Sequence, residues 1–499
     1  MKYLLMFGWV GVLWGQPTFV DPHYTADLVY AGDGMTAIDF ASTGQLLAIE
    51  KKGRVLIFQP NGSGGFFAPT VFADLTSQVN WSGEAGLLGL AVDPDFASTR
   101  HVFLFYSTDD DQRITRLTSN PGFTAMEPGS ELVLLSGLPR TANFHKAGEL
   151  RFHPLDPETL FCSTGDDGEG IGTSGGIPLV QHPDFYHGKI LRISKDNGQG
   201  VSSNPFWDGD PTSIRSRVWA VGFRNPFRFT FYPGAPIPDL LYSSENGDST
   251  DRCSWVLMGS NGAWSASGDS GGFLNPPDPN HHVMQTLPRS VLGIAIADSG
   301  PFAPGGPTLY WANWLSGIRR YHLTGANLDT LTAIPEDSGQ VFTDDIVGTD
   351  LEFGPDGNLY AAWSNGDDST GGFFTIRRIR FSGVDPPVAA FSTTPNPATG
   401  PAPLMVSFTD SSSAPGSNIA SRLWDFGDGA SSSATNPSHT YTEPGIYTAR
   451  LTVTNDEGLV DSVSQTVTAY RTVTVTLGGT VFDARTLPAS PLASANELR

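Results

Sequence analysis

The stretch 350–364, DLEFGPDGNLYAAWS, decides the fold because it contains two strands and the turn between them. Apolar residues flank Asp356-Gly357 on both sides, and an Asp-Gly pair between such runs is a strong signal for a tight β-hairpin. The same order of strand, turn and strand recurs at 37–58, 88–107 and 149–166. Hairpins that recur every few tens of residues, with no helical periodicity between them, predict the blades of a β-propeller rather than a sandwich.

The composition agrees with an all-β chain of more than one domain. The chain has 499 residues, about three times the length of a typical single-core domain. Its 57 glycines, 38 prolines and 16% of charged residues are typical of many short strands joined by turns. A formal net charge of −22 would repel a phosphate backbone and an anionic lipid surface, so nucleic acid is not an expected partner.

The N-terminal residues 1–15, MKYLLMFGWVGVLWG, predict a secretory signal peptide. One lysine precedes a short apolar run, and the run ends on a small glycine. No later stretch approaches the roughly 20 continuous apolar residues that a membrane span needs, so we expect a secreted or periplasmic protein without one. The two cysteines, Cys162 and Cys253, suit export and leave two alternatives open, one disulfide bridge or two buried free thiols.

We expect the propeller to occupy residues 28–382, with about six four-stranded blades. Two long connections between blades, 169–187 and 260–286, are then predicted to gather on one face, where loops of that length are usually functional. The composition breaks at 381–387, FSGVDPP, where two prolines and a glycine end the repeat.

The following segment, 387–469, carries a second signature. Trp424-Asp-Phe-Gly-Asp-Gly429 is followed by His439-Thr-Tyr441 and Pro444-Gly-Ile-Tyr447, and together they resemble the PKD family. The resemblance implies an immunoglobulin-like β-sandwich with Trp424 in its core, acting as a spacer or in weak glycan or protein contact. Residues 470–499 contain the start of what resembles another β module, and we expect a truncated domain or a disordered tail there.

A series of motifs in the propeller resembles the soluble quinoprotein aldose dehydrogenases, the glucose/sorbosone dehydrogenase family. The first is Glu84-Ala-Gly-Leu-Leu-Gly89 with the turn Asp93-Pro-Asp-Phe96. The others follow in order: His145 within NFHKAGELRFHP, Thr164-Gly-Asp-Asp-Gly168, Gly188-Lys-Ile-Leu-Arg192, Gly222-Phe-Arg-Asn-Pro226 and Ser244-Glu-Asn-Gly-Asp248. The resemblance covers about 28–382 and implies a six-bladed propeller.

The resemblance also implies an activity, the oxidation of an aldose or oligosaccharide at its hemiacetal hydroxyl. This reaction removes the hydroxyl proton while a hydride leaves the same carbon, and a neutral imidazole suits the first task. His145 matches the family's base, Asp166 matches the carboxylate that orients it, and Glu84 matches a substrate contact.

The cofactors implied by the family are pyrroloquinoline quinone (PQQ) and calcium, with an external electron acceptor. Arg224 and Asn225 match the residues that approach the quinone, and backbone oxygens near Gly247 and Asp248 match the calcium site. A cation beside the quinone carbonyl would make it more electrophilic.

The chain departs from the family pattern in two places. Lys146-Ala147-Gly148 follow His145, where the family normally has one unspecified residue and two glycines, so a methyl group stands where close backbone approach is expected. In the late blades the family meets its anionic cofactor with Lys and Arg. Here we expect an acidic wall of Asp344, Asp345 and Asp350, with Arg319 and Arg320 facing the exterior of their strand.

Two other functions share the fold. A non-catalytic propeller, like the Hedgehog-interacting type, would bind a glycan or protein while the PKD module spaces it from a surface. A calcium-dependent lactonase or hydrolase would need a cluster of Asp, Asn and Glu ligands at the central channel. The leading hypothesis remains the quinone-dependent dehydrogenase, because His145, Asp166 and Arg224 are all present.

Overall fold

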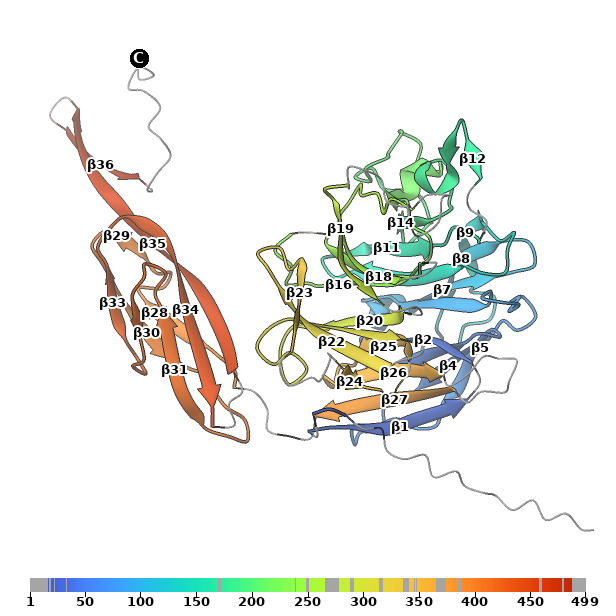
Figure 1. The fold of residues 1–499 in the computed structure, drawn as a ribbon, viewed down its shortest axis with the longest axis horizontal. Coiled ribbons are helices and arrows are strands. Elements are labelled where there is room, and N and C mark those ends of the chain that lie inside the picture. Colours follow the sequence, from blue (N-terminus) through green and yellow to red (C-terminus); the bar gives the residue numbers. More distant parts are fainter. Residues whose placement is uncertain are drawn as a thin grey trace, which may run out of the picture. The chain divides into compact units, whose positions relative to one another are not determined.

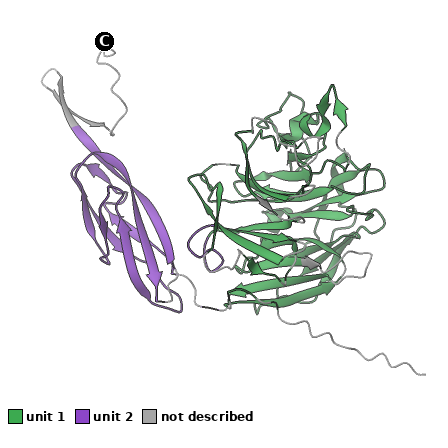
Figure 2. Cartoon of the chain, viewed as in Figure 1, with its two compact units in different colours: residues 1–298, 308–382 green, residues 299–307, 383–499 purple. Residues whose placement is uncertain are grey.

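The computed structural model describes residues 17–486, with gaps at 18, 22, 33, 169–171, 238, 248–250, 265–277, 288–290, 314–316, 335–340, 345, 347, 365–373, 382, 384–386, 457–459 and 478–479. The chain divides into two compact units (Figure 2). The first consists of residues up to 298 together with 308–382, and the second of residues 299–307 with those from 383 onward. The predicted signal peptide lies outside the described residues. Within them, no helix is both long and apolar enough to cross a membrane.

The first unit is built from six antiparallel sheets of four or more described strands (Figure 1). From the inner strand outward, the first three sheets are β2 (Met35–Phe40), β3 (Leu46–Glu50), β4 (Arg54–Phe58) and β5 (Thr70–Asp74); β6 (Leu87–Val92), β7 (His101–Ser107), β8 (Gln112–Thr118) and β9 (Leu132–Leu138); and β10 (Ala147–His153), β11 (Asp156–Thr164), β14 (Lys189–Ser194) and β15 (Val218–Val221).

The other three sheets follow in chain order. They are β16 (Pro226–Phe231), β17 (Leu241–Glu245), β18 (Asp251–Val256) and β19 (His281–Leu287); β20 (Val291–Ala297), β21 (Thr308–Asn313), β22 (Gly317–Thr324) and β23 (Thr330–Ala333), with β24 (Val341–Thr343) also on β22; and β25 (Gly348–Phe353), β26 (Leu359–Ser364), β27 (Phe374–Phe381) and β1 (Tyr24–Gly32). Short elements lie between strands of the second and third sheets. They are α1 (Phe96–Thr99) between β6 and β7, the hairpin β12 (Thr173–Ser174) and β13 (Ile177–Pro178) with the 3₁₀ turn η1 (Leu179–Gln181) between β11 and β14, and the 3₁₀ turn η2 (Arg215–Arg217) between β14 and β15.

The inner strands of these sheets form a closed ring. β2 contacts β6 and β25, β10 contacts β6 and β16, and β20 contacts β16 and β25. Sheets arranged around a ring with one strand of each at the centre make a β-propeller, so the predicted fold class is confirmed. Each inner strand also has a register shift within its first four residues, a bulge shared by all six sheets.

The ring is closed by the start of the chain. β1 pairs with β27 from Tyr24 opposite Phe381 to Gly32 opposite Phe374. β1 precedes the first sheet in the sequence but is the outermost strand of the last sheet, so β27 lies between β26 and β1. Pairing the outer edge of β27 in this way removes an exposed strand edge that would otherwise invite aggregation.

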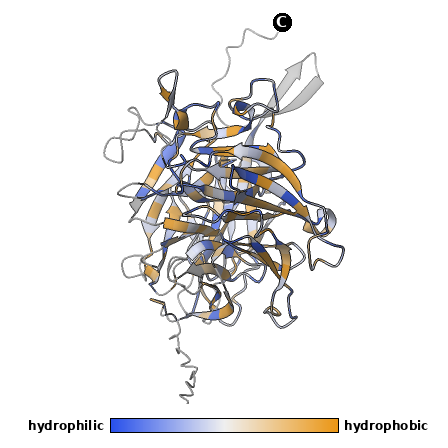
Figure 3. Cartoon of the chain, turned by 90° about the vertical axis from the view of Figure 1, so that its right-hand side faces the viewer, coloured by the Kyte–Doolittle hydropathy of each residue, from blue (hydrophilic) through white to orange (hydrophobic). Residues whose placement is uncertain are grey.

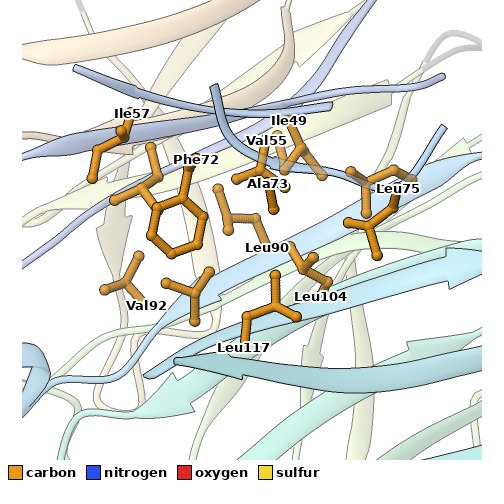
Figure 4. Close-up of a cluster of buried hydrophobic side chains, with 14 of the residues drawn as sticks. Ile49, Val55, Ile57, Phe72, Ala73, Leu75, Leu90, Val92, Leu104 and Leu117 are labelled. Carbon is orange, nitrogen blue, oxygen red and sulfur yellow. The ribbon is translucent and has the colours of Figure 1, made fainter. Parts of the chain in front are cut away.

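Apolar side chains between adjacent sheets hold the blades together. One cluster lies between the sheets of β2 and β6 and includes Ile49, Phe72, Leu90 and Leu104 (Figure 4). Hydrophobic residues gather along the strands and hydrophilic ones along many of the turns (Figure 3). At the Asp356-Gly357 turn, Gly357 has a φ of 74° and its N–H donates to the carbonyl oxygen of Gly354 at 2.9 Å, which is the tight connection that its sequence predicts.

The two cysteines are buried free thiols, the second of the two alternatives left open by the sequence. Cys162 lies on β11 and Cys253 on β18, in different sheets. Burial raises the pKa of Cys253 to about 12 and that of Cys162 well above its usual range. Both are therefore packing residues rather than reactive thiolates.

The second unit is a β-sandwich. One sheet contains β28 (Phe391–Thr394), β30 (Leu404–Asp410) and β33 (Ser438–Tyr441); the other contains β29 (Thr399–Pro401), β35 (Val460–Leu477), β34 (Gly445–Asn455), β31 (Ile419–Asp425) and β32 (Ser431–Ser432), with β36 (Thr480–Thr486) on β35. Trp424 is fully buried between the rings of Phe391 and Phe408, at centroid distances of 5.1 and 5.4 Å. The predicted core position of Trp424 is confirmed.

The segment that the sequence assigns to a further module continues the sandwich up to residue 486. β35 runs without a break through residue 470 to Leu477, and β36 turns back along it, with Arg471 opposite Thr486. The described part of this segment is therefore a hairpin that extends the last long strand of the sandwich. Residues 487–499 lie outside the described residues.

Candidate active site

The functional residues predicted from the sequence lie at one end of the ring. Glu84, His145 and Arg224 each stand a few residues before an inner strand, namely β6, β10 and β16. Asp166 follows β11, whose end pairs with the start of β10, and Gly247 follows β17, whose end pairs with the start of β16. Residues from three successive sheets therefore meet at the same mouth of the central channel.

His145 and Asp166 form the centre of this group. Nδ1 of His145 lies 2.7 Å from Oδ1 of Asp166, and the two side chains are 13% and 4% exposed. The Asp166 carboxylate also accepts hydrogen bonds from the Gly168 N–H at 2.9 Å and from Nε1 of Trp264 at 3.1 Å. An acceptor fixed in this way selects the imidazole tautomer with its proton on Nδ1, which leaves Nε2 free of a proton.

A glycine is required beside His145 by the close approach of two loops. A Cβ atom on Gly165 would lie 1.8 Å from the carbonyl oxygen of His145, a distance that no side chain tolerates. The Thr164-Gly-Asp-Asp-Gly168 motif is thus needed to bring the Asp166 carboxylate within reach of the imidazole.

Glu84 holds the backbone of the histidine. Its carboxylate accepts a hydrogen bond from the His145 N–H at 2.5 Å, and its own N–H donates to the carbonyl oxygen of Asn143 at 2.7 Å. Glu84 is exposed at the rim of the site. It stands where a substrate contact is predicted, and it also positions His145, which has a φ of 59°.

Arg224 and Asn225 link the neighbouring sheets. The Arg224 carbonyl accepts from the Asp166 N–H at 2.7 Å, and Nη1 of Arg224 donates to the carbonyl oxygens of Asn246 and Gly247 at 3.1 and 2.8 Å. The Asn225 side chain accepts from the Ala147 N–H at 2.9 Å and donates to Oδ1 of Asn246 at 3.3 Å. Asp248, the second predicted calcium residue, lies outside the described residues.

Ala147 shows how the chain accommodates its departure from the family pattern. Its φ is 48°, in the left-handed region that glycine adopts without strain, and it is fully buried. A non-glycine residue in this region costs roughly 1–2 kcal/mol. The methyl group nevertheless does not prevent close approach, because the Ala147 N–H still reaches Asn225. The position that cannot carry a side chain is Gly148, where a Cβ atom would lie 2.6 Å from the ring of Phe105.

A buried ion pair lies under the histidine loop. Lys146 and Asp167 are 1% and 2% exposed, and Nζ of Lys146 contacts Oδ1 of Asp167. Burial lowers the pKa of Lys146. Burial also opposes the ionised form of Asp167, but hydrogen bonds from Lys146 and Thr141 outweigh it, and the pKa of Asp167 is lowered. The pair fixes the loop 141–146 to the turn that carries Asp166.

The late blades differ from the sequence prediction. Asp350 does not form part of an acidic wall: it is buried, and its carboxylate accepts from the N–H groups of Ile38 and Leu351, both at 3.0 Å. Asp344 is bound to Arg319 at 2.9 Å. Arg320 does not face the exterior either, because it is 1% exposed beneath the rings of Tyr24 and Phe342. The third expected member of the wall, Asp345, lies outside the described residues.

Sequence reasoning missed Trp264 and Glu245. Trp264 binds the Asp166 carboxylate, and its ring centroid lies 5.5 Å from the guanidinium carbon of Arg224. Glu245 is buried and accepts from the Arg224 N–H at 2.6 Å. The signal for Trp264 was the one tryptophan in the Gly- and Ser-rich connection 260–286. Glu245 is part of the motif Ser244-Glu-Asn-Gly-Asp248, in which a role was assigned only to the last two residues.

A cavity of about 220 Å³ lies at the other end of the inner strands β2, β6 and β10. Its charged lining residues are Asp39, Arg151 and Glu352. Burial, with a contribution from the neighbouring Glu352, raises the pKa of Asp39 to about 8. Among the residues that the structure describes, no group of three or more His, Cys, Asp or Glu side chains is arranged to hold a metal ion.

Comparison with known proteins follows the division of the fold. Residues 34–370 match the family model for glucose/sorbosone dehydrogenases, which covers more than half of the chain. The chain belongs to the glucose/sorbosone dehydrogenase family. Residues 384–471 match the PKD domain.

Among curated relatives of this family, the aldose sugar dehydrogenase YliI of Escherichia coli is 24% identical over 388 residues, which are 72% of this chain and 93% of that protein. The quinoprotein glucose dehydrogenase B of Acinetobacter calcoaceticus is 27% identical over 234 residues, 42% of this chain, and the chain spans 46% of that relative's length. The PQQ-bound aldose sugar dehydrogenase of Streptomyces coelicolor has the same fold, with a TM-score of 0.53, 21% identity, and coverage of 72% of this chain and 98% of that one.

Proposed function

We propose that this protein is an exported sugar dehydrogenase that oxidises an aldose or oligosaccharide at its hemiacetal hydroxyl with PQQ and calcium. The observation that carries the proposal is the His145–Asp166 pair, at 2.7 Å, on the same rim of the channel as Arg224, Asn225 and the carbonyl oxygen of Gly247. Family membership supports this assignment, and so do the names of the relatives above.

His145 is the proton acceptor in this proposal. Asp166 holds Nδ1, so Nε2 presents its lone pair to the sugar hydroxyl. As the proton arrives, the imidazole becomes a cation, and the buried carboxylate of Asp166 stabilises that charge. The carboxylate of Glu84 is committed to the His145 N–H through one oxygen, and its exposed position suits an additional hydrogen bond to a sugar hydroxyl.

The donor set at this rim fits the two cofactors. The carbonyl oxygens of Asn246 and Gly247 accept from Nη1 of Arg224 in this structure. Such oxygens are also ligands that calcium accepts, and a guanidinium suits the oxygens of an anionic quinone, so binding of the two cofactors would exchange these contacts for contacts to calcium and PQQ. Nδ1 of His187, a half-buried residue whose pKa is lowered by burial, has no hydrogen-bond partner among the described residues. The carboxylates of Asp166 and Asp167 lie near enough to act on that pKa in the opposite direction. When bound, PQQ would supply a hydride acceptor, and calcium would supply the positive charge that polarises a quinone carbonyl.

Arg224 and Asn225 would hold the cofactor, and the ring of Trp264, 5.5 Å from the guanidinium carbon of Arg224, would keep that side chain in place. Both carboxylates of the expected acidic wall that the structure describes have cationic partners: Asp350 lies 3.5 Å from Nε of Arg228, and Asp344 is paired with Arg319. This pairing lowers their opposition to an anion at the site. An external electron acceptor is the further partner that this reaction would require. The PKD module is proposed to contact a glycan or protein and takes no part in the chemistry.

The test is reconstitution of the purified full-length chain with calcium and PQQ. An absorbance titration measures quinone binding, and a dye acceptor reports oxidation while a panel of aldoses is scanned. We expect saturable quinone binding and dye reduction that both require calcium. If no quinone binding is detected at saturating calcium, the dehydrogenase proposal fails, and the non-catalytic propeller becomes the preferred account.

A further inference from the structure

Two exposed aromatic side chains border the site, and the chemistry at His145 uses neither. Of the Phe and Trp side chains that the structure describes, three are more than a third exposed: Phe67 at 61%, Trp81 at 47% and Phe144 at 44%. Trp81 stands three residues before Glu84, so their Cα atoms are at most about 11 Å apart. Phe144 immediately precedes His145. Exposed aromatic rings beside a polar site are typical of surfaces that bind ligands with apolar faces.

The ring of Phe144 is fixed against the histidine. Its centroid lies 5.0 Å from that of the His145 imidazole, and the two planes meet at 77°. Below it, the ring covers Gly168, where a Cβ atom would come within 2.3 Å of the ring. Gly168 follows the Asp166-Asp167 pair, so the same turn orients the imidazole and supports the phenyl ring. The side chain is supported on one side and is still 44% exposed.

The loop that carries Trp81 is also held in place. Oδ1 of Asn80 accepts hydrogen bonds from the N–H and the hydroxyl of Ser82 at 3.0 and 2.8 Å, and Nδ2 of Asn80 donates to Asp109 at 2.7 Å. Nζ of Lys52 lies 5.4 Å from the centroid of the indole ring. An indole on a loop with this many fixed contacts is presented to solvent in a defined position, which lowers the entropy lost when a ligand binds it.

The two aromatic residues belong to loops that touch. The N–H of Glu84 donates to the carbonyl oxygen of Asn143, and the hydroxyl of Ser82 lies 3.5 Å from Oδ1 of Asn143. His145, Phe144, the Asn143–Ser82 contact and Trp81 therefore follow one another along a single stretch of surface. We propose that this stretch binds linear oligosaccharides: the reducing-end unit lies at His145, and the following units stack their C–H faces on Phe144 and Trp81.

This inference rests on the proposed dehydrogenase function and names its substrate class. Polar groups flank these rings: Nζ of Lys52 lies over Trp81, and Nη2 of Arg140 lies 3.5 Å from the hydroxyl of Ser82. A pyranose ring has an apolar C–H face and a rim of hydroxyl groups, so it suits such a surface. In this arrangement the units beyond the reducing end occupy the two rings, so a monosaccharide at His145 would not use both of them. The protein should therefore prefer trisaccharides with a free reducing end over the corresponding monosaccharides.

The kinetic test compares kcat/KM for maltotriose, cellotriose and chitotriose with the values for glucose and N-acetylglucosamine. We expect a preference for at least one trisaccharide, and the Trp81→Ala variant should lower the ratio of trisaccharide to monosaccharide kcat/KM by roughly tenfold. Trp81→Tyr should restore most of the ratio, because it keeps an aromatic face. Phe144→Leu, which still covers Gly168, should lower it as well.

Phe67→Ala is the matched control. Phe67 is the third exposed ring, and it follows the end of β4. The turn that precedes β4 contains Lys51, whose carbonyl oxygen accepts from the N–H of Leu87 at the start of β6, near Glu84. Phe67 therefore lies at the opposite end of its sheet from the site, and its replacement should leave the ratio unchanged. The proposal would be overturned if kcat/KM were equal for the monosaccharide and the trisaccharide with maltotriose, cellotriose and chitotriose alike. It would also be overturned if Trp81→Ala and Phe67→Ala changed the ratio of trisaccharide to monosaccharide kcat/KM by the same factor.

A binding measurement separates this proposal from the dehydrogenase function. Saturation-transfer NMR with the cofactor-free protein should show transfer to protons of the non-reducing units of the preferred trisaccharide, and Trp81→Ala should abolish it. If this transfer is seen but no sugar is oxidised by the reconstituted protein, the aromatic surface stands and the dehydrogenase function fails. If sugars are oxidised but transfer is confined to the reducing-end unit, the oligosaccharide proposal fails.

Discussion

Replacing Asp166 by Asn removes one negative charge beside His145 and keeps the size of the side chain. The carboxylate accepts three hydrogen bonds, from His145, Gly168 and Trp264, at 2.7, 2.9 and 3.1 Å. An amide offers one oxygen in place of two, so at least one of these donors would face an NH₂ group. We expect the imidazole to lose its fixed tautomer and the charge that stabilises its protonated form.

The size of the effect follows from these contacts. A hydrogen bond to a charged group contributes about 1.5–3 kcal/mol, and this contribution grows in the transition state, where the imidazole takes up the proton. Its loss should lower the turnover number by roughly 10- to 150-fold. Quinone affinity should stay near that of the wild type, because Asp166 holds the base and the proposed cofactor contacts come from Arg224 and Asn225.

The assay is dye reduction by the reconstituted Asp166→Asn variant at saturating sugar, with quinone affinity measured by absorbance titration. The PKD module supplies a matched control, because Nε2 of His439 lies 2.7 Å from Oδ2 of Asp428, a second His–Asp pair of equal length. Asp428→Asn should leave the turnover number unchanged. A turnover number for Asp166→Asn within about threefold of the wild type would refute the proposed role of this carboxylate.

Four further outcomes are expected. His145→Ala should lower the turnover number by about 10²- to 10⁴-fold with little change in calcium or quinone affinity, whereas Arg224→Ala should lower affinity and rate together; titrations and kinetics distinguish the two. Truncation after Ser382 should leave dye reduction by the propeller intact, and a truncated protein that no longer folds would contradict this. Asp167→Asn leaves a buried lysine without its partner and should lower the free energy of unfolding by about 3–5 kcal/mol in denaturant titrations, with part recovered in the Lys146→Met double variant. Burial raises the pKa of Asp39 from 3.8 to about 8, so between these two pH values the folded protein keeps a proton that the unfolded chain has released. The free energy of unfolding should therefore fall as the pH rises from about 4 to about 8. Thermal melts of Asp39→Asn should show a smaller dependence on pH.

Local patterns were sufficient to predict the fold. Asp356-Gly357 predicts its hairpin because a glycine in the turn adopts a positive φ without strain, and Trp424 predicts a sandwich core because a large ring in a short alternating strand must be buried. The motifs around His145, Asp166 and Arg224 identify residues that meet at one mouth, because each motif adjoins the end of an inner strand. Their catalytic and cofactor-binding roles remain predictions.

The partners of these residues could not be predicted because they are distant in the sequence. Trp264 reaches Asp166 across 98 positions, from a loop with no periodicity of its own. Asp350 was expected in the acidic wall because a sequence does not show toward which neighbours a strand residue turns. Its hydrogen-bond partner, the N–H of Ile38, is 312 positions away in the sequence. Arg320 was expected on the exterior for the same reason, and it lies instead under the ring of Tyr24, a residue of the strand that closes the ring.

The closure of the ring by β1 has a mechanical consequence. β27 is the last strand before the PKD module, and it is paired along its length with β26 on one side and with β1 on the other. A tension applied through the PKD module would reach the propeller at the end of β27. The hydrogen bonds of an antiparallel pair run across the strand direction, so the component of that tension along β27 would have to shear two ladders together. The strand that leads to the PKD module is thus an interior strand of its sheet, and both neighbouring strands, β26 and β1, would resist its removal.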